Sequence, residues 1–520
     1  MKNLPIGTQS FENLRENDNL YVDKTELIYR IATTGRIYFL SRPRRFGKSL
    51  TISTLKALFR GQKELFKGLW IENKWDWTQA PNPVIHFDWS AIEHDTAAMM
   101  EEDTKAYIHK IGVDYGLNLQ RPFAAGQFGE LIQELHQKTG RKVVILIDEY
   151  DCPIFDSLDL PLLDDVKRFL QKFYRQLKAN DDHIRFIFMT GITKYAKLSL
   201  FSTLNNPLDI TMDEKYAALC GYTQAELEYY FTEYIDATAA KMGNTRERLI
   251  ERIRYWYDGY TWDGKTHVYN PFSTLNFFEM KRFRDYWFNS GTPTYLIEQL
   301  KKRDEAVLIM NPVTVNENKF DSFDPENIDN IALMLQSGYL TVKDIQIKDE
   351  TPEYTLGVPN EEVKNSMMTY LVSLFSFKAL SKVDFIIQDM MAQLRSLDSE
   401  GFAGSIGSLI ANIPYPLQIK NEKYYHSLFL SWMLSMGFKI DGEVMTNIGR
   451  IDAVLETPEM TVVSELKFHV RKSVTKLLDE AMTQINDRRY YEKYQQQSKP
   501  IVLMGLAFSG KKTGCRFKQI

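Results

Sequence analysis

The sequence predicts a multidomain α/β protein with an N-terminal parallel α/β domain, a central and mainly helical region, and a second α/β domain at the C-terminus. Short apolar stretches alternate with helix-like segments near both ends of the chain. A length of 520 residues exceeds one ordinary core and suggests about three domains. We expect the parts to be residues 1–212, 213–365, a helical connector at 366–400, and 401–520.

Composition limits the classes of function. Hydrophobic residues make up 44% and charged residues 25%, as in packed soluble proteins. The net charge of −4 does not indicate nucleic-acid binding by overall electrostatics, so such binding would need local basic clusters. The three cysteines lie far apart, and no apolar stretch approaches the ~18 residues of a membrane span. We therefore expect a cytoplasmic protein with no membrane segment.

The first 212 residues predict strands that alternate with helices. The expected strands are IYFL (37–40), RKVVILIDEYD (141–151) and HIRFIFMTGIT (183–193), and the expected helices are 22–35, 49–61 and 164–180. This alternation predicts a parallel sheet with right-handed crossovers.

The central region changes character near residue 213, where helical segments rich in aromatic residues begin. The aromatics of 255–288 suit a packed core, although stacking on nucleic-acid bases is an alternative. A helix near residue 328 followed by two strands predicts either a winged-helix-like element or a plain hairpin.

The C-terminal part predicts a second α/β unit after a glycine-rich loop or hinge at 399–408. Its expected elements are a helix at 421–440, strands at 449–456 and 460–469, a polar helix reaching Tyr494, and a strand at 500–508.

The stretch SRPRRFGKSLT (41–51) predicts a phosphate-binding loop with one departure. The pattern GxxxxGK[ST] requires glycine at position 42, where this chain has Arg42. An apolar strand precedes the loop and a helix follows it, so backbone N–H groups at the helix N-terminus could hold phosphate. We expect Lys48 to reach the β and γ phosphates and Ser49 to bind Mg²⁺. A chance GKS is the alternative.

The apolar strand ending in LIDEYD predicts the acids that accompany such a loop. Asp148 is expected to hold Mg²⁺ through water, and Glu149 to polarise the attacking water. Thr190 or Thr193, at the end of the next strand, could sense the γ-phosphate. A buried strand that simply ends in solvated acids is the alternative.

The stretches SRPRRFGKSLT, LIDEYD and FMTGITKYAKLSLFSTLNNPLDIT resemble the AAA-ATPase-like family of P-loop proteins, from about Leu4 to Val363. RPRRFGKS is the usual loop of that family. The resemblance implies a P-loop NTPase fold, with ATP bound by Arg44, Arg45, Phe46, Gly47, Lys48, Ser49, Leu50, Asp148 and Thr190. The alternative for the two arginines is a solvated basic edge.

The stretch GRIDAVLETPEMTVVSELKF suggests phosphodiester cleavage, which needs carboxylates for a metal and a cation near the water. Glu465 and Lys467 are two apart on a strand and share one face, while Leu466 points into the core. A hairpin would bring Asp452 beside Glu465. An ordinary surface strand with a Glu–Lys salt bridge is the alternative.

Flanking helices extend this pattern. Glu422 and His426 are four residues apart, and Gln484, Arg488 and Tyr491 follow at helical spacing. The order of these elements over 400–510 resembles the PD-(D/E)xK nuclease superfamily, which has a restriction-endonuclease-like fold. The resemblance implies metal binding by Asp452 and Glu465, positioning of water by Lys467, and support from Glu422 and Gln484. His426 has no implied role and suits a structural histidine.

These observations predict an ATP-hydrolysing protein coupled to a Mg²⁺-dependent endonuclease that acts on DNA or RNA, and a homo-oligomer is compatible with them. One alternative is a nucleotide-dependent molecular switch whose tail binds nucleic acid or a protein partner without cleavage. Another is a plain ATPase with a structural tail.

Overall fold

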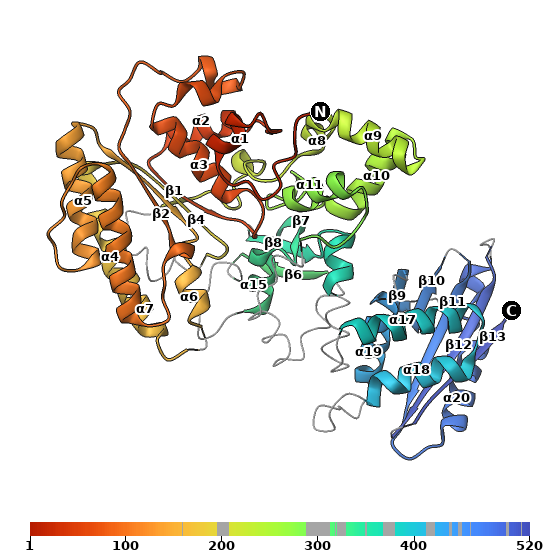
Figure 1. Ribbon diagram of the computed structural model, residues 1–520. Coiled ribbons are helices and arrows are strands. Elements are labelled where there is room, and N and C mark those ends of the chain that lie inside the picture. The colour runs from red at the N-terminus through yellow and green to blue at the C-terminus, as the bar shows by residue number, and fades with distance from the viewer. Residues whose placement is uncertain are drawn as a thin grey trace. The chain divides into compact units, whose positions relative to one another are not determined.

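The computed structural model divides the chain into two compact units, Met1–Val363 and Lys364–Ile520, which are described separately (Figure 1). The structure describes residues 1–158, 160–194, 207–287, 312–317, 319, 329–348, 351–367, 380–411, 422–435, 439–445, 450–457, 459–495, 499–510 and 512–520. The bounds of the four expected parts stay predictions, and residues 368–379 of the expected connector lie outside the described residues.

A five-stranded parallel sheet organises the N-terminal part of the first unit. Its strands are β1 (Ile37–Ser41), β2 (Val84–Asp88), β3 (Val143–Asp148), β4 (Ile184–Gly191) and β5 (Leu208–Asp209), in the order β2-β3-β4-β1-β5. All six residues of β3 are buried, as expected of a central parallel strand. The predicted parallel α/β sheet is confirmed. The short edge strands β2 and β5 had no strong signal in the sequence.

Helices cover the sheet on both sides, and Figure 1 shows α4, α5 and α7 grouped away from α1, α2 and α3. Their bounds are α1 (Phe11–Glu16), α2 (Thr25–Thr34), α3 (Lys48–Phe59), α4 (Ala97–Asp114), α5 (Ala124–Thr139), α6 (Cys152–Asp156) and α7 (Leu163–Ala179). Short 3₁₀ turns occupy Lys63–Phe66, Trp70–Asn73, Trp89–Ala91, Asp181–His183, Glu214–Tyr216 and Glu492–Tyr494. Since the carboxyl ends of parallel strands share one edge, the loop after β1 and the acids after β3 face a common space.

The central region packs four helices around aromatic side chains. These helices are α8 (Gln224–Tyr230), α9 (Thr232–Met242), α10 (Arg246–Tyr257) and α11 (Pro271–Met280). Tyr257, Phe277 and Phe278 are at most 1% exposed, so the core interpretation of the 255–288 aromatics is confirmed for these three residues, and the buried Phe231 packs with them.

A helix followed by a hairpin closes the first unit, as predicted. Helix α15 (Asn330–Ser337) precedes β7 (Thr341–Lys348) and β8 (Thr351–Gly357). An additional strand, β6 (Val313–Asn316), makes an antiparallel sheet of order β6-β8-β7.

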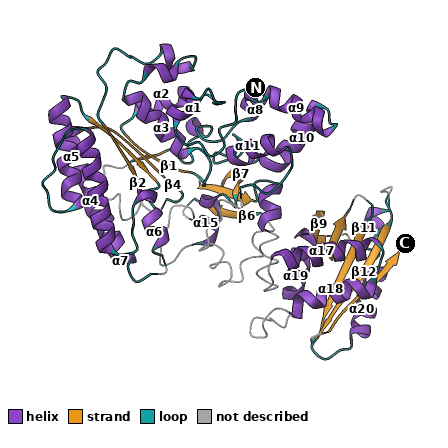
Figure 2. Ribbon diagram, viewed as in Figure 1, coloured by secondary structure: helices purple, strands orange, loops and turns teal. Residues whose placement is uncertain are grey.

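The second unit is a mixed sheet between helices, drawn as orange strands and purple helices in Figure 2. Its elements are α17 (Leu380–Arg395), α18 (Ser399–Ala411), α19 (Glu422–Ser435), β9 (Lys439–Met445), β10 (Arg450–Glu456), β11 (Thr461–Phe468), α20 (Val474–Asp487), β12 (Ile501–Ser509) and β13 (Lys512–Gln519). The order is β13-β12-β11-β10-β9, with only β11 and β12 parallel, and α20 connects them. The predicted second α/β unit is confirmed.

The loop predicted at 399–408 is wrong, because these residues form the first part of α18. Phe402, Ile406 and Leu409 recur at helical spacing and are fully buried in the core of the unit. Burial of such side chains contributes about 1.5–3 kcal/mol each, which outweighs the roughly 1 kcal/mol that each glycine costs in a helix.

The polar helix predicted to reach Tyr494 is also wrong, because α20 ends at Asp487. Arg489 adopts a left-handed backbone with φ 44°, which turns the chain. The turn buries Tyr490 and Tyr494 in the core beneath α20. Tyr491 therefore does not share a helical face with Gln484.

Candidate functional sites

The loop between β1 and α3 has the backbone of a tight anion-binding turn. Gly47 caps α3 with φ 98°, a left-handed conformation that favours glycine. Arg45 also has a positive φ, 66°. The first N–H groups of α3 therefore follow directly on the turn, where helix N-termini attract phosphate.

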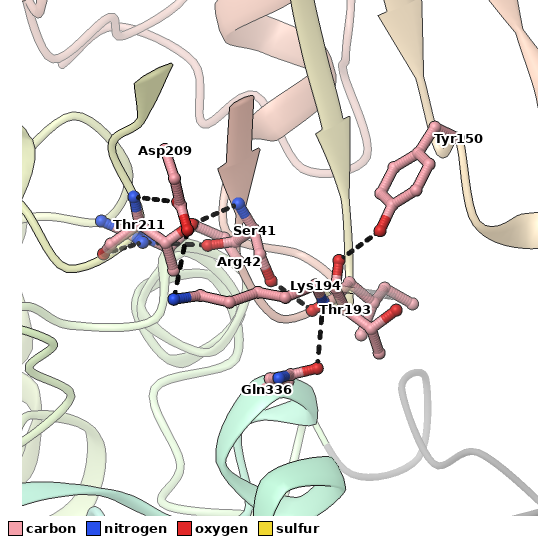
Figure 3. Close-up of polar contacts among 9 residues, drawn as sticks. Ser41, Arg42, Tyr150, Thr193, Lys194, Asp209, Thr211 and Gln336 are labelled. Carbon is pink, nitrogen blue, oxygen red and sulfur yellow. Dashed lines mark hydrogen bonds and ion pairs between the residues drawn. The ribbon is translucent and has the colours of Figure 1, made fainter. Parts of the chain in front are cut away.

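Arg42, in the position of the missing glycine, turns into the protein (Figure 3). Its Nη1 donates to the carbonyl oxygens of Ser41 at 2.9 Å and Thr211 at 2.8 Å. Its guanidinium carbon lies 3.9 Å from the ring centroid of Trp262, and the side chain is fully buried. Burial lowers the pKa of Arg42 to about 10, so it stays charged at neutral pH. Arg42 thus anchors the loop from behind.

Polar contacts tie the ends of the sheet strands to α15 near this anchor (Figure 3). The Lys194 ammonium lies 3.2 Å from Asp209, and its backbone N–H donates to Gln336 Oε1 at 3.1 Å. The Tyr150 hydroxyl donates to the carbonyl of Thr193 at 2.7 Å. These contacts fix the edge at which the acids of β3 emerge.

Two further side chains hold the outer part of the loop. Trp287 Nε1 donates to the carbonyl oxygen of Arg44 at 3.1 Å. Phe46 is buried edge-on against Tyr260 and Trp262, with centroid distances of 4.8 and 5.5 Å. Phe46, predicted to bind nucleotide, can therefore contribute only its backbone.

A cavity of about 400 Å³ opens beside the loop. Its polar lining includes Arg44, Arg45, Gly47, Lys48, Ser49 and Glu149, and its apolar lining includes Leu50, Pro5, Leu14, Pro271, Phe272 and Leu275. The Arg45 guanidinium carbon lies 5.3 Å from the Phe272 ring centroid. A cavity lined by both cationic and apolar side chains suits a nucleotide, which has charged phosphates and an apolar base.

Lys48 is buried and folds back onto its own loop. Its Nζ donates to the carbonyl oxygens of Arg42 at 3.0 Å and Pro43 at 3.1 Å. A phosphate in the cavity would replace these acceptors with more strongly charged oxygens.

The acids after β3 are held by threonines from β4 and its end. Asp148 Oδ1 accepts hydrogen bonds from the Thr190 hydroxyl and from the backbone N–H of Glu149. Asp151 accepts from the backbone N–H and the hydroxyl of Thr193, at 2.7 and 2.8 Å. Burial raises the pKa of Glu149, which makes its carboxylate a stronger proton acceptor.

The second site lies on β10 and β11. Asp452 Oδ2 accepts the backbone N–H of Leu466 at 2.8 Å, and Glu465 Oε1 accepts from Lys467 Nζ at 2.8 Å. Glu465 is 1% exposed, and its Oε2 is buried without a hydrogen-bond partner. Leu466 points to the opposite face, into the core that includes Phe429.

The electrostatics of this site suit a cation. Burial, and then the charge of Asp452, raise the pKa of Glu465 to about 7. Burial lowers the pKa of Lys467, but the hydrogen bond and charge of Glu465 outweigh it, and the net pKa is raised. A buried carboxylate with a free oxygen beside a second carboxylate matches the oxygen ligands that Mg²⁺ prefers.

Three flanking residues lie around these strands. Glu422 Oε2 accepts the backbone N–H of Phe468 at 3.3 Å. His426 Nε2 lies 2.7 Å from the carbonyl oxygen of Asp452, which suits the structural role considered for it. Gln484 is half-buried on α20, the helix that packs on β11 and β12. Its part in the site stays a prediction.

Comparison with known proteins agrees with this geometry. Residues 5–201 match the family described as "Predicted AAA-ATPase", and residues 420–517 match the PD-(D/E)XK nuclease superfamily. The chain is 35% identical over 524 residues to an "Uncharacterized protein in vnfD 5'region" of Azotobacter chroococcum mcd 1, covering 98% of this chain and 96% of that protein. The chain belongs to the AAA-ATPase-like family. The C-terminal match of this AAA-ATPase-like protein spans all five positions proposed for the nuclease site.

Sequence reasoning missed Trp262 and Thr211, which hold Arg42 from more than 160 residues away along the chain. Trp262 lies in none of the motifs, and Thr211 ends the stretch FMTGITKYAKLSLFSTLNNPLDIT without any local signal that pairs it with Arg42. Within the described ranges of the AAA-ATPase-like chain, no helix combines the length and apolarity needed to cross a bilayer.

Proposed function

We propose that this AAA-ATPase-like protein hydrolyses ATP in the cavity beside the loop, and that its nucleotide state controls Mg²⁺-dependent cleavage of DNA or RNA by the C-terminal domain. The observation that carries the proposal is the lining of one cavity by Lys48 and Ser49, at the start of α3, and by Glu149, directly after β3. We also propose a cytoplasmic location, which three unpaired cysteines favour.

In the ATP site, Lys48 and the first N–H groups of α3 would bind the phosphates, with Arg44 and Arg45 adding charge-assisted contacts. Ser49 and Asp148 would hold Mg²⁺, which neutralises phosphate charge when bound. Glu149 would orient the attacking water and accept its proton. The apolar side chains of Pro271, Phe272 and Leu275 would contact the adenine base of ATP.

In the nuclease site, Asp452 and Glu465 would hold Mg²⁺, which activates water and stabilises phosphate charge when bound. The unpartnered Oε2 of Glu465 supports this assignment, since an unsatisfied buried carboxylate oxygen is costly without a cation. Lys467 would position the water.

The test uses the full-length chain with labelled single- and double-stranded DNA and RNA, Mg²⁺ or Mn²⁺, and ATP present or absent. Lys48→Ala should abolish ATP turnover, and Lys467→Ala should abolish cleavage while turnover persists. Lys476→Ala, on the exposed surface of α20, is the matched control and should cleave normally.

The proposal has separable halves. Unchanged ATP binding and turnover in Lys48→Ala would show that ATP does not bind at this loop. Intact turnover with no cleavage of any substrate would replace the nuclease with the molecular switch.

A further inference from the structure

Three side chains with metal-binding atoms gather at the wall of the nucleotide cavity and have no role in the two sites proposed above. His94, Cys152 and Asp156 each offer one ligand atom, and these atoms lie within 4.8 Å of one another. Cys152 and Asp156 stand at the two ends of α6, four residues apart and therefore on one face. His94 comes from the segment between the Trp89–Ala91 turn and α4. The cluster therefore joins two segments that are far apart in the sequence.

Contacts within the cluster orient each metal-ligand atom. Asp156 Oδ2 lies 3.0 Å from His94 Nε2 and accepts from the Cys152 Sγ at 3.3 Å. His94 Nδ1 lies 2.7 Å from the carbonyl oxygen of Ile92, so Nδ1 carries a proton and Nε2 points at the other donors. A backbone carbonyl on one ring nitrogen commonly orients a histidine whose other nitrogen binds a metal.

The same geometry argues against a nucleophilic cysteine. Such a cysteine needs a base, usually an imidazole, within hydrogen-bond reach of its sulfur. Here the hydrogen-bond partner of Sγ is the Asp156 carboxylate and not the imidazole, whose Nε2 also contacts Asp156. The imidazole is therefore not placed to take a proton directly from the sulfur.

The donor set selects the kind of metal. Thiolate, imidazole and carboxylate together favour Zn²⁺, whereas Mg²⁺ prefers oxygen ligands alone. Zn²⁺ binds such atoms at about 2.0–2.3 Å, so the present spacing needs only small side-chain adjustments. Three protein ligands leave a fourth position for water or another small ligand.

We propose that His94, Cys152 and Asp156 form a Zn²⁺ site at the wall of the nucleotide cavity. Cys152 lines that cavity and follows Glu149 by three residues. A metal bridging α6 to the His94 segment would restrain the backbone that carries Glu149. We expect Zn²⁺ at this site to slow ATP turnover, a consequence that rests on the proposed ATPase function, while the binding site itself does not.

The test replaces Zn²⁺ with Co²⁺ in the full-length protein, freed of metal by a chelator and carrying no histidine tag. Thiolate ligation gives a near-ultraviolet sulfur-to-cobalt charge-transfer band. We expect one equivalent of Co²⁺ with this band, and competition with a chromogenic chelator gives the Zn²⁺ affinity. Cys152→Ser should lose the band, and His94→Gln and Asp156→Asn should weaken Zn²⁺ binding by about tenfold or more.

Two control variants are titrated with Co²⁺ in the same way. Cys515→Ser and His109→Gln, which alter a buried cysteine of the second unit and an exposed histidine of α4, should keep both band and affinity. The Asp156 side chain is 51% exposed, so Asp156→Asn tests the site without disturbing a core. A band that survives in Cys152→Ser, or no cobalt band in the parent, overturns the proposal. Zn²⁺ binding together with no ATP turnover by the Zn²⁺-free protein in Mg²⁺ keeps this site and removes the proposed ATPase.

Discussion

The guanidinium carbon of Arg42 lies 3.9 Å from the centroid of the Trp262 ring. A cation over an indole ring is stabilised by about 2 kcal/mol when both are desolvated, and two backbone carbonyls add charge-assisted hydrogen bonds. The arginine that breaks the glycine pattern of the loop is therefore a structural anchor between the loop and the central region.

Arg42→Gly, which restores the glycine of the general pattern, should lower the stability of the protein rather than improve nucleotide binding. We expect the free energy of unfolding to fall by about 2–4 kcal/mol, because the cation–π contact and two hydrogen bonds are lost. Urea unfolding of Arg42→Gly, Trp262→Leu and the double variant should give a coupling energy of about 1–2 kcal/mol. Additive effects of the two substitutions would contradict the anchor.

Glu149→Gln should separate ATP binding from hydrolysis. The amide keeps the size of the side chain but cannot accept a proton, so turnover should fall by about 100-fold or more while ATP affinity changes little. Steady-state phosphate release and equilibrium binding of a labelled nucleotide measure the two effects. Normal turnover in this variant would assign the base to another residue.

Arg44→Ala and Arg45→Ala decide whether these arginines bind phosphate or form a solvated edge. Both line the cavity, so each substitution should weaken ATP binding by roughly tenfold, more at low salt than at high salt. Arg248→Ala, on the exposed face of α10, is the control and should bind ATP like the parent. Equal affinities in all four proteins would favour the solvated edge.

Glu362 should make the stability of the first unit depend on pH. Burial raises the pKa of Glu362 to about 8, although its Oε1 accepts hydrogen bonds from the backbone N–H of Trp287 and from the Ser273 hydroxyl. The folded chain therefore keeps a proton that the unfolded chain releases above about pH 4.5, so the free energy of unfolding falls as pH rises toward about 8.

Glu362→Gln removes this ionisation and keeps an acceptor at Oε1. We expect the variant to exceed the parent in unfolding free energy near pH 8, by a few kcal/mol as an order of magnitude, and to match it near pH 5. Urea unfolding across this range gives the difference. A difference that does not change with pH would show that Glu362 titrates normally.

The elements that sequence periodicity predicted well are those whose signals are local. The apolar stretches of β1, β3 and β4 alternate with amphipathic helices, and this pattern requires a parallel sheet whatever packs around it. The helix at 399–411 was missed because its glycines locally indicate a loop. The burial of Phe402, Ile406 and Leu409, which favours the helix, depends on the sheet beneath them. The early end of α20 likewise depends on the burial of Tyr490 and Tyr494.

The candidate sites divide in the same way. Gly47, Lys48 and Asp148, like Glu465 and Lys467, follow from spacing along a loop or strand, so the sequence alone determined which residues to consider. Only the tertiary structure decided that Arg42 faces Trp262, that Arg44 and Arg45 line the cavity, and that His94 meets Cys152. The physical reason is that spacing fixes the face of one element, whereas contacts between distant segments depend on how whole elements pack.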